Sequence, residues 1–189
     1  MPSSNIVSVL KRGGLGVIPT DTLYGVVASA QNKKAVARLY HLRRKTEGKP
    51  FIILISSVSE LVDFGVTLSL FEKEILKKVW PGKVSVVFPC PQKKFSYLHL
   101  GTQSLAFRFP RASKLISLLK KTGPLLAPSA NPEGKPPATT ITEAKNYFGS
   151  AVDFYVSAGK KREGKPSTLI SFPEGKLKIL RQGSVYINI

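Results

Sequence analysis

Residues 15–25 read LGVIPTDTLYG, an apolar run that ends in a cluster of hydroxyl side chains. The run predicts a buried β-strand over residues 15–19. Ligands of open α/β sheets commonly bind at the carboxyl ends of strands, so Thr20 and Thr22 are candidate ligand contacts. An ordinary turn after the strand would explain the same residues, and an acid such as Asp21 is more often a turn former than a base.

Short apolar runs alternate with helical patterns over the rest of the chain. Further strands are expected over residues 51–56, 83–88, 104–109, 125–127, 152–156, 167–172 and 176–180. Helices are expected after Asn32, Ser57, Ser69 and Ser113 and near residues 142–148, with capping boxes at Ser57 and Ser69. Strands mixed with helices indicate an α/β or α+β domain. We expect a single domain over residues 1–189, because no segment has the character of a linker.

The composition limits the classes of function. The 189 residues include 29 Lys and Arg against 11 Asp and Glu, a net charge of +18. Such a charge points to an anionic partner, either a nucleotide, a nucleic acid or an anionic lipid, although a generally basic proteome would explain it equally well. One cysteine and two histidines argue against a zinc site, so no metal-binding residue is expected. No apolar run is long enough for a membrane span or a secretory signal, which favours a cytoplasmic protein without membrane contact.

The common catalytic motifs are absent. The sequence holds no Walker A loop, no GxGxxG, no HExxH and no GxSxG, and paired carboxylates are scarce. Chemistry that needs a catalytic triad, bound zinc or a carboxylate pair is therefore disfavoured. Loops rich in hydroxyls and cations remain, and they suit a substrate that carries several phosphates.

Four further segments carry side chains of this kind. Residues 43–45 and Lys49 place four cations at a helix end, more than the helix dipole requires. Arg108 lies on a predicted strand, where an arginine is costly unless an anion pairs with it. Residues 128–131 read PSAN and follow another apolar run, while residues 80–82 read WPG and suggest a packing corner. Each segment taken alone also has a purely structural explanation.

In their order and wording, these segments resemble the YrdC-type threonylcarbamoyl-AMP synthase family. The matching motifs are PTDTLYG at 19–25, RRKT at 43–46 with KPF at 49–51, WPG at 80–82, SLAFR at 104–108, PSAN at 128–131, STL at 167–169 and LRQG at 180–183. The match extends from about residue 13 to residue 183. The family's usual Lys-x-Arg order is Arg43 and Lys45 here, and Thr46 replaces a proline. Lysine cannot bind a phosphate bidentately, so this exchange affects the phosphate geometry rather than the charge.

The resemblance implies a fold and an activity. The fold would be α/β, with a YrdC-like twisted mixed sheet, surrounding helices and a concave basic face, and without the second C-terminal domain of longer members. The activity would form L-threonylcarbamoyl-AMP and pyrophosphate from L-threonine, bicarbonate and ATP, with Mg²⁺ carried by the ATP. A separate transferase would then use the product to modify tRNA. The alternative is an RNA-binding or ribosome-associated module on the same fold, which would bind tRNA or other RNA weakly and without catalysis.

The resemblance also implies roles for individual residues. The catalytic cations would be Arg43 and Lys45. The threonine contacts would be Thr22, Arg108, Ala127 and Ser167. The ATP contacts would be Lys45, Lys49, Ser104, Ser129, Asn131, Pro137 and Arg181. Because Arg181 lies late in the chain, that part of the chain must return to the site near Thr22.

Overall fold

The computed structural model describes residues 4–43, 50–160 and 165–187. The α-helices in these ranges are α1 (Ser4–Lys11), α2 (Lys33–Arg43), α3 (Leu70–Val79), α4 (Ser96–His99), α5 (Ser113–Thr122) and α6 (Ile141–Phe148). Short 3₁₀ helices are η1 (Val58–Phe64), η2 (Lys93–Phe95), η3 (Gly149–Ala151) and η4 (Pro173–Gly175). The strands are β1 (Gly16–Pro19), β2 (Tyr24–Ser29), β3 (Ile52–Leu54), β4 (Val84–Pro89), β5 (Ser104–Arg108), β6 (Leu125–Leu126), β7 (Phe154–Tyr155), β8 (Thr168–Ser171) and β9 (Lys178–Arg181).

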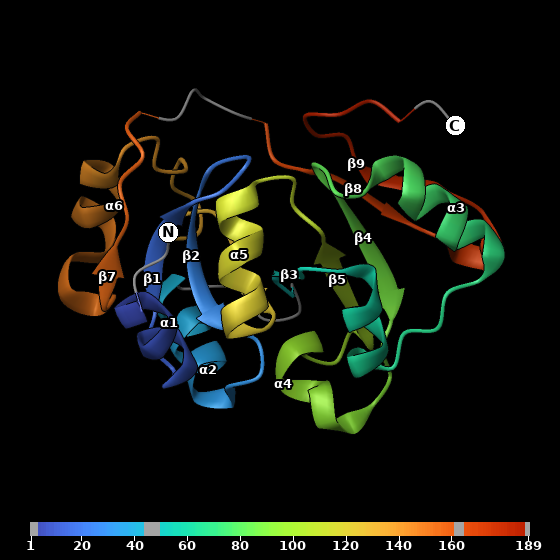
Figure 1. Ribbon diagram of the computed structural model, residues 1–189, viewed down its shortest axis with the longest axis horizontal. Helices are drawn as coiled ribbons and strands as arrows, with labels where there is room; N and C mark the ends of the chain where they lie inside the picture. Colours follow the sequence, from blue (N-terminus) through green and yellow to red (C-terminus); the bar gives the residue numbers. More distant parts are fainter. Residues whose placement is uncertain (1–3, 44–49, 161–164, 188–189) are drawn as a thin grey trace.

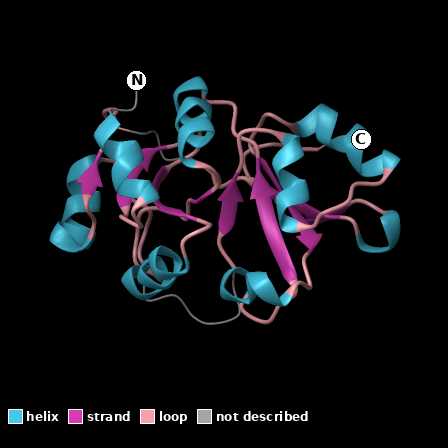
Figure 2. Ribbon diagram, turned by 60° about the horizontal axis from the view of Figure 1, so that its bottom comes forward, coloured by secondary structure: helices cyan, strands magenta, loops and turns pink. Residues whose placement is uncertain are grey.

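The strands form one nine-stranded mixed sheet in the order β7-β1-β2-β6-β3-β5-β4-β8-β9. The pairs β1–β7, β3–β5 and β4–β8 are parallel, and the remaining neighbours are antiparallel. Helices surround the strands, as Figures 1 and 2 show. The expected α/β class and mixed sheet are confirmed, whereas the concave basic face stays a prediction. None of the described helices is both long and apolar enough to cross a membrane.

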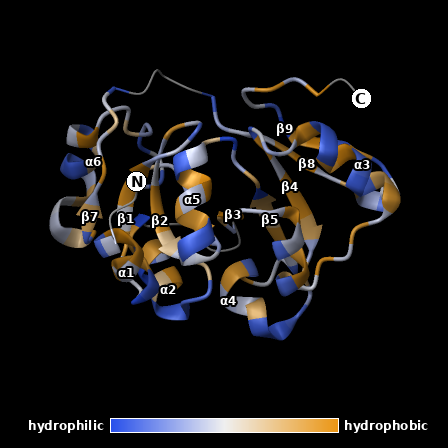
Figure 3. Ribbon diagram, viewed as in Figure 1, coloured by the Kyte–Doolittle hydropathy of each residue, from blue (hydrophilic) through white to orange (hydrophobic). Residues whose placement is uncertain are grey.

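The central strands are covered on both faces. Adjacent residues of β1 and β3 alternate between two apolar clusters, so that Val17 and Ile53 belong to one and Ile18 and Leu54 to the other. Helices α1 and α5 pack on the second cluster, and α5 lies across the middle of the sheet in Figure 1. Figure 3 shows the strands of this central region as mainly hydrophobic. The unbroken apolar character of these strands in the sequence follows from this burial on both sides.

On β5, alternate residues face the apolar core on one side and a cavity on the other. Leu105 and Phe107 point into the larger apolar cluster, while Ala106 and Arg108 line a cavity on the opposite face. On β8, Ile170 belongs to the same cluster and Leu169 lines the cavity. The period of two along a strand therefore separates the core from the candidate site.

Several local expectations differ from the structure. Strand β2 was not expected, because its sequence YGVVAS mixes valines with small residues of weak strand preference, yet all six of its residues are buried. The capping box at Ser69 is present, and Asn32 Oδ1 accepts the Ala35 N–H at 3.0 Å as expected. The prediction of a capping box at Ser57 is wrong, because the Ser57 side chain makes no cap hydrogen bond. Its carboxylate partner, Glu60, instead accepts the Ser56 N–H at 3.0 Å, and the helix that follows is 3₁₀ rather than α.

Candidate functional site

A cavity of about 560 Å³ lies where β1 and β2 meet the ends of β5, β8 and β9. It brings together residues that the sequence predicts as site residues from six separate segments. Those that line it are Thr22, Arg43, Arg108, Ala127, Ser129, Pro137, Ser167 and Arg181. The part of the chain around Arg181 thus returns to the site near Thr22, as expected. Lys45 and Lys49 lie outside the described residues.

Two predicted residues are not part of the cavity wall. Ser104 begins β5, and its hydroxyl donates to Thr102 Oγ1 at 3.4 Å. Asn131 is buried, and its side-chain amide donates to the carbonyl oxygens of Pro132 at 2.9 Å and Lys135 at 2.7 Å. The Asn131 side chain therefore closes its own loop rather than facing the cavity.

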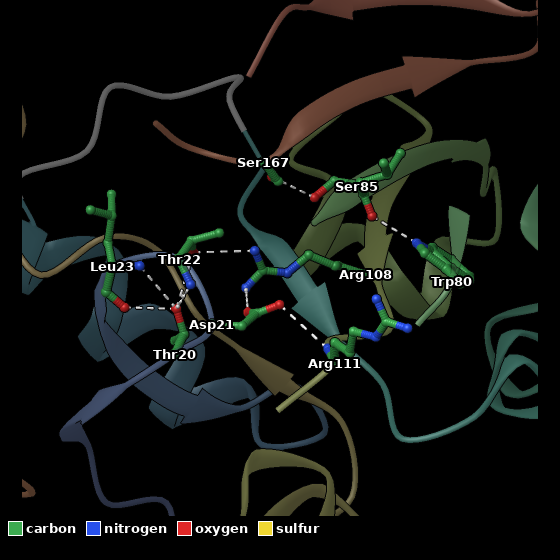
Figure 4. Close-up of polar contacts among 10 residues, drawn as sticks. Thr20, Asp21, Thr22, Leu23, Trp80, Ser85, Arg108, Arg111 and Ser167 are labelled. Carbon is green, nitrogen blue, oxygen red and sulfur yellow. Dashed lines mark hydrogen bonds and ion pairs between the residues drawn. The ribbon is translucent and has the colours of Figure 1, made fainter. Parts of the chain in front are cut away.

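The turn between β1 and β2 is built by the Thr20 hydroxyl. This oxygen donates to Leu23 O at 2.7 Å and accepts the backbone N–H groups of Thr22 at 3.1 Å and Leu23 at 3.2 Å. The Thr20 N–H also donates to Leu23 O at 3.0 Å. A hydroxyl that replaces backbone partners inside a turn holds the turn in one shape. The side chains of Asp21 and Thr22 are presented by this braced turn (Figure 4).

Arg108 reaches from β5 to this turn. Its Nη1 donates to Thr22 Oγ1 at 3.3 Å, and its Nη2 lies 3.2 Å from Asp21 Oδ1. The side chains of the ion pair are only 5% and 8% exposed, for Arg108 and Asp21 respectively. The anion that an arginine on this strand requires is therefore Asp21, a residue that the sequence suggested only as a turn former.

Positive charge exceeds negative charge around Arg108. Burial lowers the pKa of Arg108, the Asp21 carboxylate opposes that effect, and the Arg181 guanidinium lowers the pKa further. Burial also lowers the pKa of Arg181. Arg181 Nη2 donates to the Ser167 carbonyl at 3.0 Å, which fixes the second guanidinium beside the first. Two guanidinium groups near a single carboxylate form a site suited to a bound anion.

Two residues near the cavity were not predicted as site residues from the sequence. Ser85 on β4 is fully buried, and its hydroxyl lies 2.8 Å from the hydroxyl of Ser167. A single serine within the apolar run VSVVFP was the available signal. Tyr24 lines the cavity, and its hydroxyl donates to Gly159 O at 2.8 Å and accepts the Ala158 N–H at 2.9 Å. Tyr24 therefore holds residues 158 and 159, which follow β7, next to the cavity.

Arg43 is positioned by the loop opposite it. Its Nε donates to the Asn131 carbonyl at 2.6 Å, and the Glu133 N–H donates to the Arg43 carbonyl at 2.9 Å. The guanidinium carbon lies 5.5 Å from the centre of the Phe51 ring. Burial lowers the pKa of Arg43, and the Glu133 carboxylate opposes that effect. These contacts tie the end of α2 to the PSAN loop while Arg43 lines the cavity.

Over residues 4–43, 50–160 and 165–187, no group of three or more His, Cys, Asp or Glu side chains could hold a metal ion. Among the same residues, the charged side chains that line the cavity are the guanidinium groups of Arg43, Arg108 and Arg181, which attract anions.

The chain is similar in sequence to proteins of one family. A model of the Sua5/YciO/YrdC family, which carries the description "Telomere recombination", matches residues 8–183. A putative threonylcarbamoyl-AMP synthase of Mycobacterium leprae is 32% identical over 185 residues, which are 97% of this chain and 84% of that protein. The threonylcarbamoyl-AMP synthase of Bacillus subtilis is 28% identical over 180 residues, which are 94% of this chain and 52% of that protein.

Solved structures share the fold. The structure of P. abyssi Sua5 complexed with L-threonine superposes with a TM-score of 0.87 at 28% identity, and covers 95% of this chain and 53% of that one. The structure of E. coli YciO superposes with a TM-score of 0.83 at 23% identity, and covers 95% of this chain and 87% of that one. The chain thus spans about half the length of the B. subtilis and P. abyssi relatives, and most of the length of the others.

Proposed function

Because the chain belongs to the Sua5/YciO/YrdC family, we propose that it is a threonylcarbamoyl-AMP synthase. It forms L-threonylcarbamoyl-AMP and pyrophosphate from L-threonine, bicarbonate and ATP. The observation that carries this proposal is the buried Arg108, held by Thr22 and Asp21 in a cavity that Arg181 also enters. The relatives from M. leprae and B. subtilis bear the name of this activity, the former as putative, and the P. abyssi structure contains L-threonine.

The threonine carboxylate binds at Arg108. The guanidinium is almost fully buried, and its Nε has no hydrogen-bond partner among the described residues. A buried donor without a partner is costly, and a substrate carboxylate removes that cost while pairing with the charge. Thr22 and Ser167 offer hydroxyls to the same amino acid, and Ala127 offers backbone groups.

The nucleotide lies on the Arg181 side of the cavity. Arg43, Ser129, Pro137 and Arg181 all line the cavity. The family resemblance assigns Lys45 and Lys49 to the ATP phosphates too, and both lie outside the described residues. Mg²⁺, carried by ATP, neutralises phosphate charge.

The reaction needs positioning and charge neutralisation more than a reactive side chain. The threonine amine combines with bicarbonate to give a carbamate, and water is released. A carbamate oxygen then attacks the α-phosphorus of ATP, a new P–O bond forms, and the bond to pyrophosphate breaks. The cations around the cavity stabilise the charge that develops on the leaving pyrophosphate. A separate transferase then carries the threonylcarbamoyl group to tRNA.

Pyrophosphate release tests the proposal. Release that requires both threonine and bicarbonate is the expected result. Arg38→Ala serves as a matched control for Arg108→Ala, because Arg38 pairs with Asp153 at 2.8 Å and does not line the cavity. Pyrophosphate release that ignores threonine would contradict the proposal, and RNA binding without any release would favour the RNA-binding alternative.

A further inference from the structure

Asp21 occupies an unusual place in the candidate site. It lies between Thr20 and Thr22, both of which line the cavity, but Asp21 itself does not line it. Its side chain is only 8% exposed. Any effect of Asp21 on a bound substrate must therefore pass through a neighbouring side chain.

That neighbour is the Arg108 guanidinium. Its two terminal nitrogens are held by adjacent residues of one turn, Nη1 by Thr22 at 3.3 Å and Nη2 by Asp21 at 3.2 Å. The second carboxylate oxygen of Asp21 accepts the Arg111 N–H at 3.4 Å, so the carboxylate is itself anchored (Figure 4). Contacts at two separate nitrogens restrict rotation of the guanidinium plane.

We propose that Asp21 is a positioning residue, which aims the Arg108 guanidinium at the carboxylate of the amino-acid substrate. This inference rests on the proposed function, because it takes the substrate to be threonine. A guanidinium carries five N–H donors, so beside its contacts to Thr22 and Asp21 the cavity-lining Arg108 keeps terminal N–H groups for a substrate carboxylate. A carboxylate pairs best with a guanidinium whose donors are already oriented, because the two partners then lose little freedom on binding.

A simpler role for Asp21 makes the opposite prediction. If Asp21 only neutralises Arg108, its carboxylate repels the substrate carboxylate. Its removal would then leave Arg108 and Arg181 with uncompensated charge and would lower the KM for threonine. Positioning predicts a higher KM for threonine after the same change. The sign of the change therefore separates the two roles.

The experiment compares Asp21→Asn with the wild-type protein. Asn keeps the shape of Asp and removes its charge. We expect the KM and the Kd for threonine to rise by about tenfold or more, because the buried ion pair that holds Nη2 is broken. The KM for ATP should stay within about twofold of its wild-type value. Pyrophosphate release gives the two KM values, and titration calorimetry gives the Kd without requiring turnover.

Asp153→Asn is the matched control. Asp153 also pairs with an arginine and accepts the Leu15 N–H at 2.7 Å, but it does not line the cavity. We expect Asp153→Asn to lower the melting temperature and to change neither KM. If Asp21→Asn does not fold, Asp21→Glu takes its place, because it keeps the charge and moves it by one methylene. A threonine KM that is unchanged or lower in either folded variant of Asp21 overturns the inference.

The two proposals fail in different ways. A wild-type protein that binds threonine without releasing pyrophosphate contradicts the synthase activity, and the calorimetric comparison of Asp21→Asn still decides the positioning role. A wild-type protein that binds no threonine overturns both proposals.

Discussion

Gly183 is the residue at which a single added methyl group should disturb the site most. A Cβ at this position would lie 2.3 Å from the Pro166 carbonyl oxygen, 2.4 Å from the Ser167 carbonyl carbon and 2.5 Å from the Thr168 nitrogen. All three are backbone atoms, so no flexible side chain can swing aside. Ordinary contact begins at 3.4 Å, and Gly183→Ala therefore forces the two segments apart by about 1 Å.

This displacement should cost about 2–3 kcal/mol, the usual range for overpacking against rigid neighbours. For a domain of this size such a loss lowers the melting temperature by roughly 4–12 °C. The shift also separates Arg181 from the Ser167 carbonyl, a contact of 3.0 Å. Losing a hydrogen bond to a charged group should raise the KM for ATP and threonine by about tenfold.

Calorimetry measures the melting temperature, and pyrophosphate release measures the two KM values. Gly175→Ala is the control, because a Cβ there meets no atom within 4 Å, and only its φ of +73° opposes an alanine. We expect this variant to lose some stability and to keep both KM values. If Gly183→Ala melts within about 2 °C of the wild-type protein and keeps its KM values, the close backbone approach is refuted.

Three further predictions concern single side chains. Arg108→Ala should abolish threonine-dependent ATP consumption, and near wild-type consumption would remove Arg108 from the substrate site. Ser85→Ala should raise the KM for threonine about threefold to tenfold, because the Ser167 hydroxyl loses its partner at 2.8 Å, and an unchanged KM would contradict this role. Burial raises the pKa of Tyr40 from 10.0 to about 12, so stability should be complete below pH 10 and fall between pH 10 and 12, where the unfolded chain ionises first. Urea unfolding at pH 9 and pH 11 checks this decline, part of which should be absent in Tyr40→Phe.

The strands expected after residue 50 all exist. The apolar runs of β3, β4, β5 and β6 report their burial, whereas all four residues of β9 are exposed. β3 is shorter than its apolar run, since a run continues to be buried after its backbone has left the sheet. The helix α1 was not expected, and only Leu10 among its residues is buried. The order of the nine strands depends on pairings between distant segments, which local patterns do not encode.

The features of the candidate site were likewise only partly predictable from the sequence. Thr22 and Arg108 could be found from their motifs, but the pairing of Arg108 with Asp21 could not, since the two residues come from separate segments that only folding brings together. Ser104 and Arg108 lie on the same face of β5. Four residues of a strand span about 13 Å, however, so residues at the two ends of β5 meet different surroundings. Ser104 consequently lies outside the cavity wall.

The cavity draws on the whole length of the chain, and this affects the moment at which a newly made molecule becomes competent. The turn at residues 20–23 closes locally, and Arg108 can join Asp21 once the middle of the chain has left the ribosome. Arg181 follows 73 residues after Arg108, roughly 4–15 s later at about 5–20 residues per second. Because Ser167 and Arg181 both line the cavity, a nascent chain that stalls before them carries an incomplete site. The site is therefore complete only after β9 has been translated.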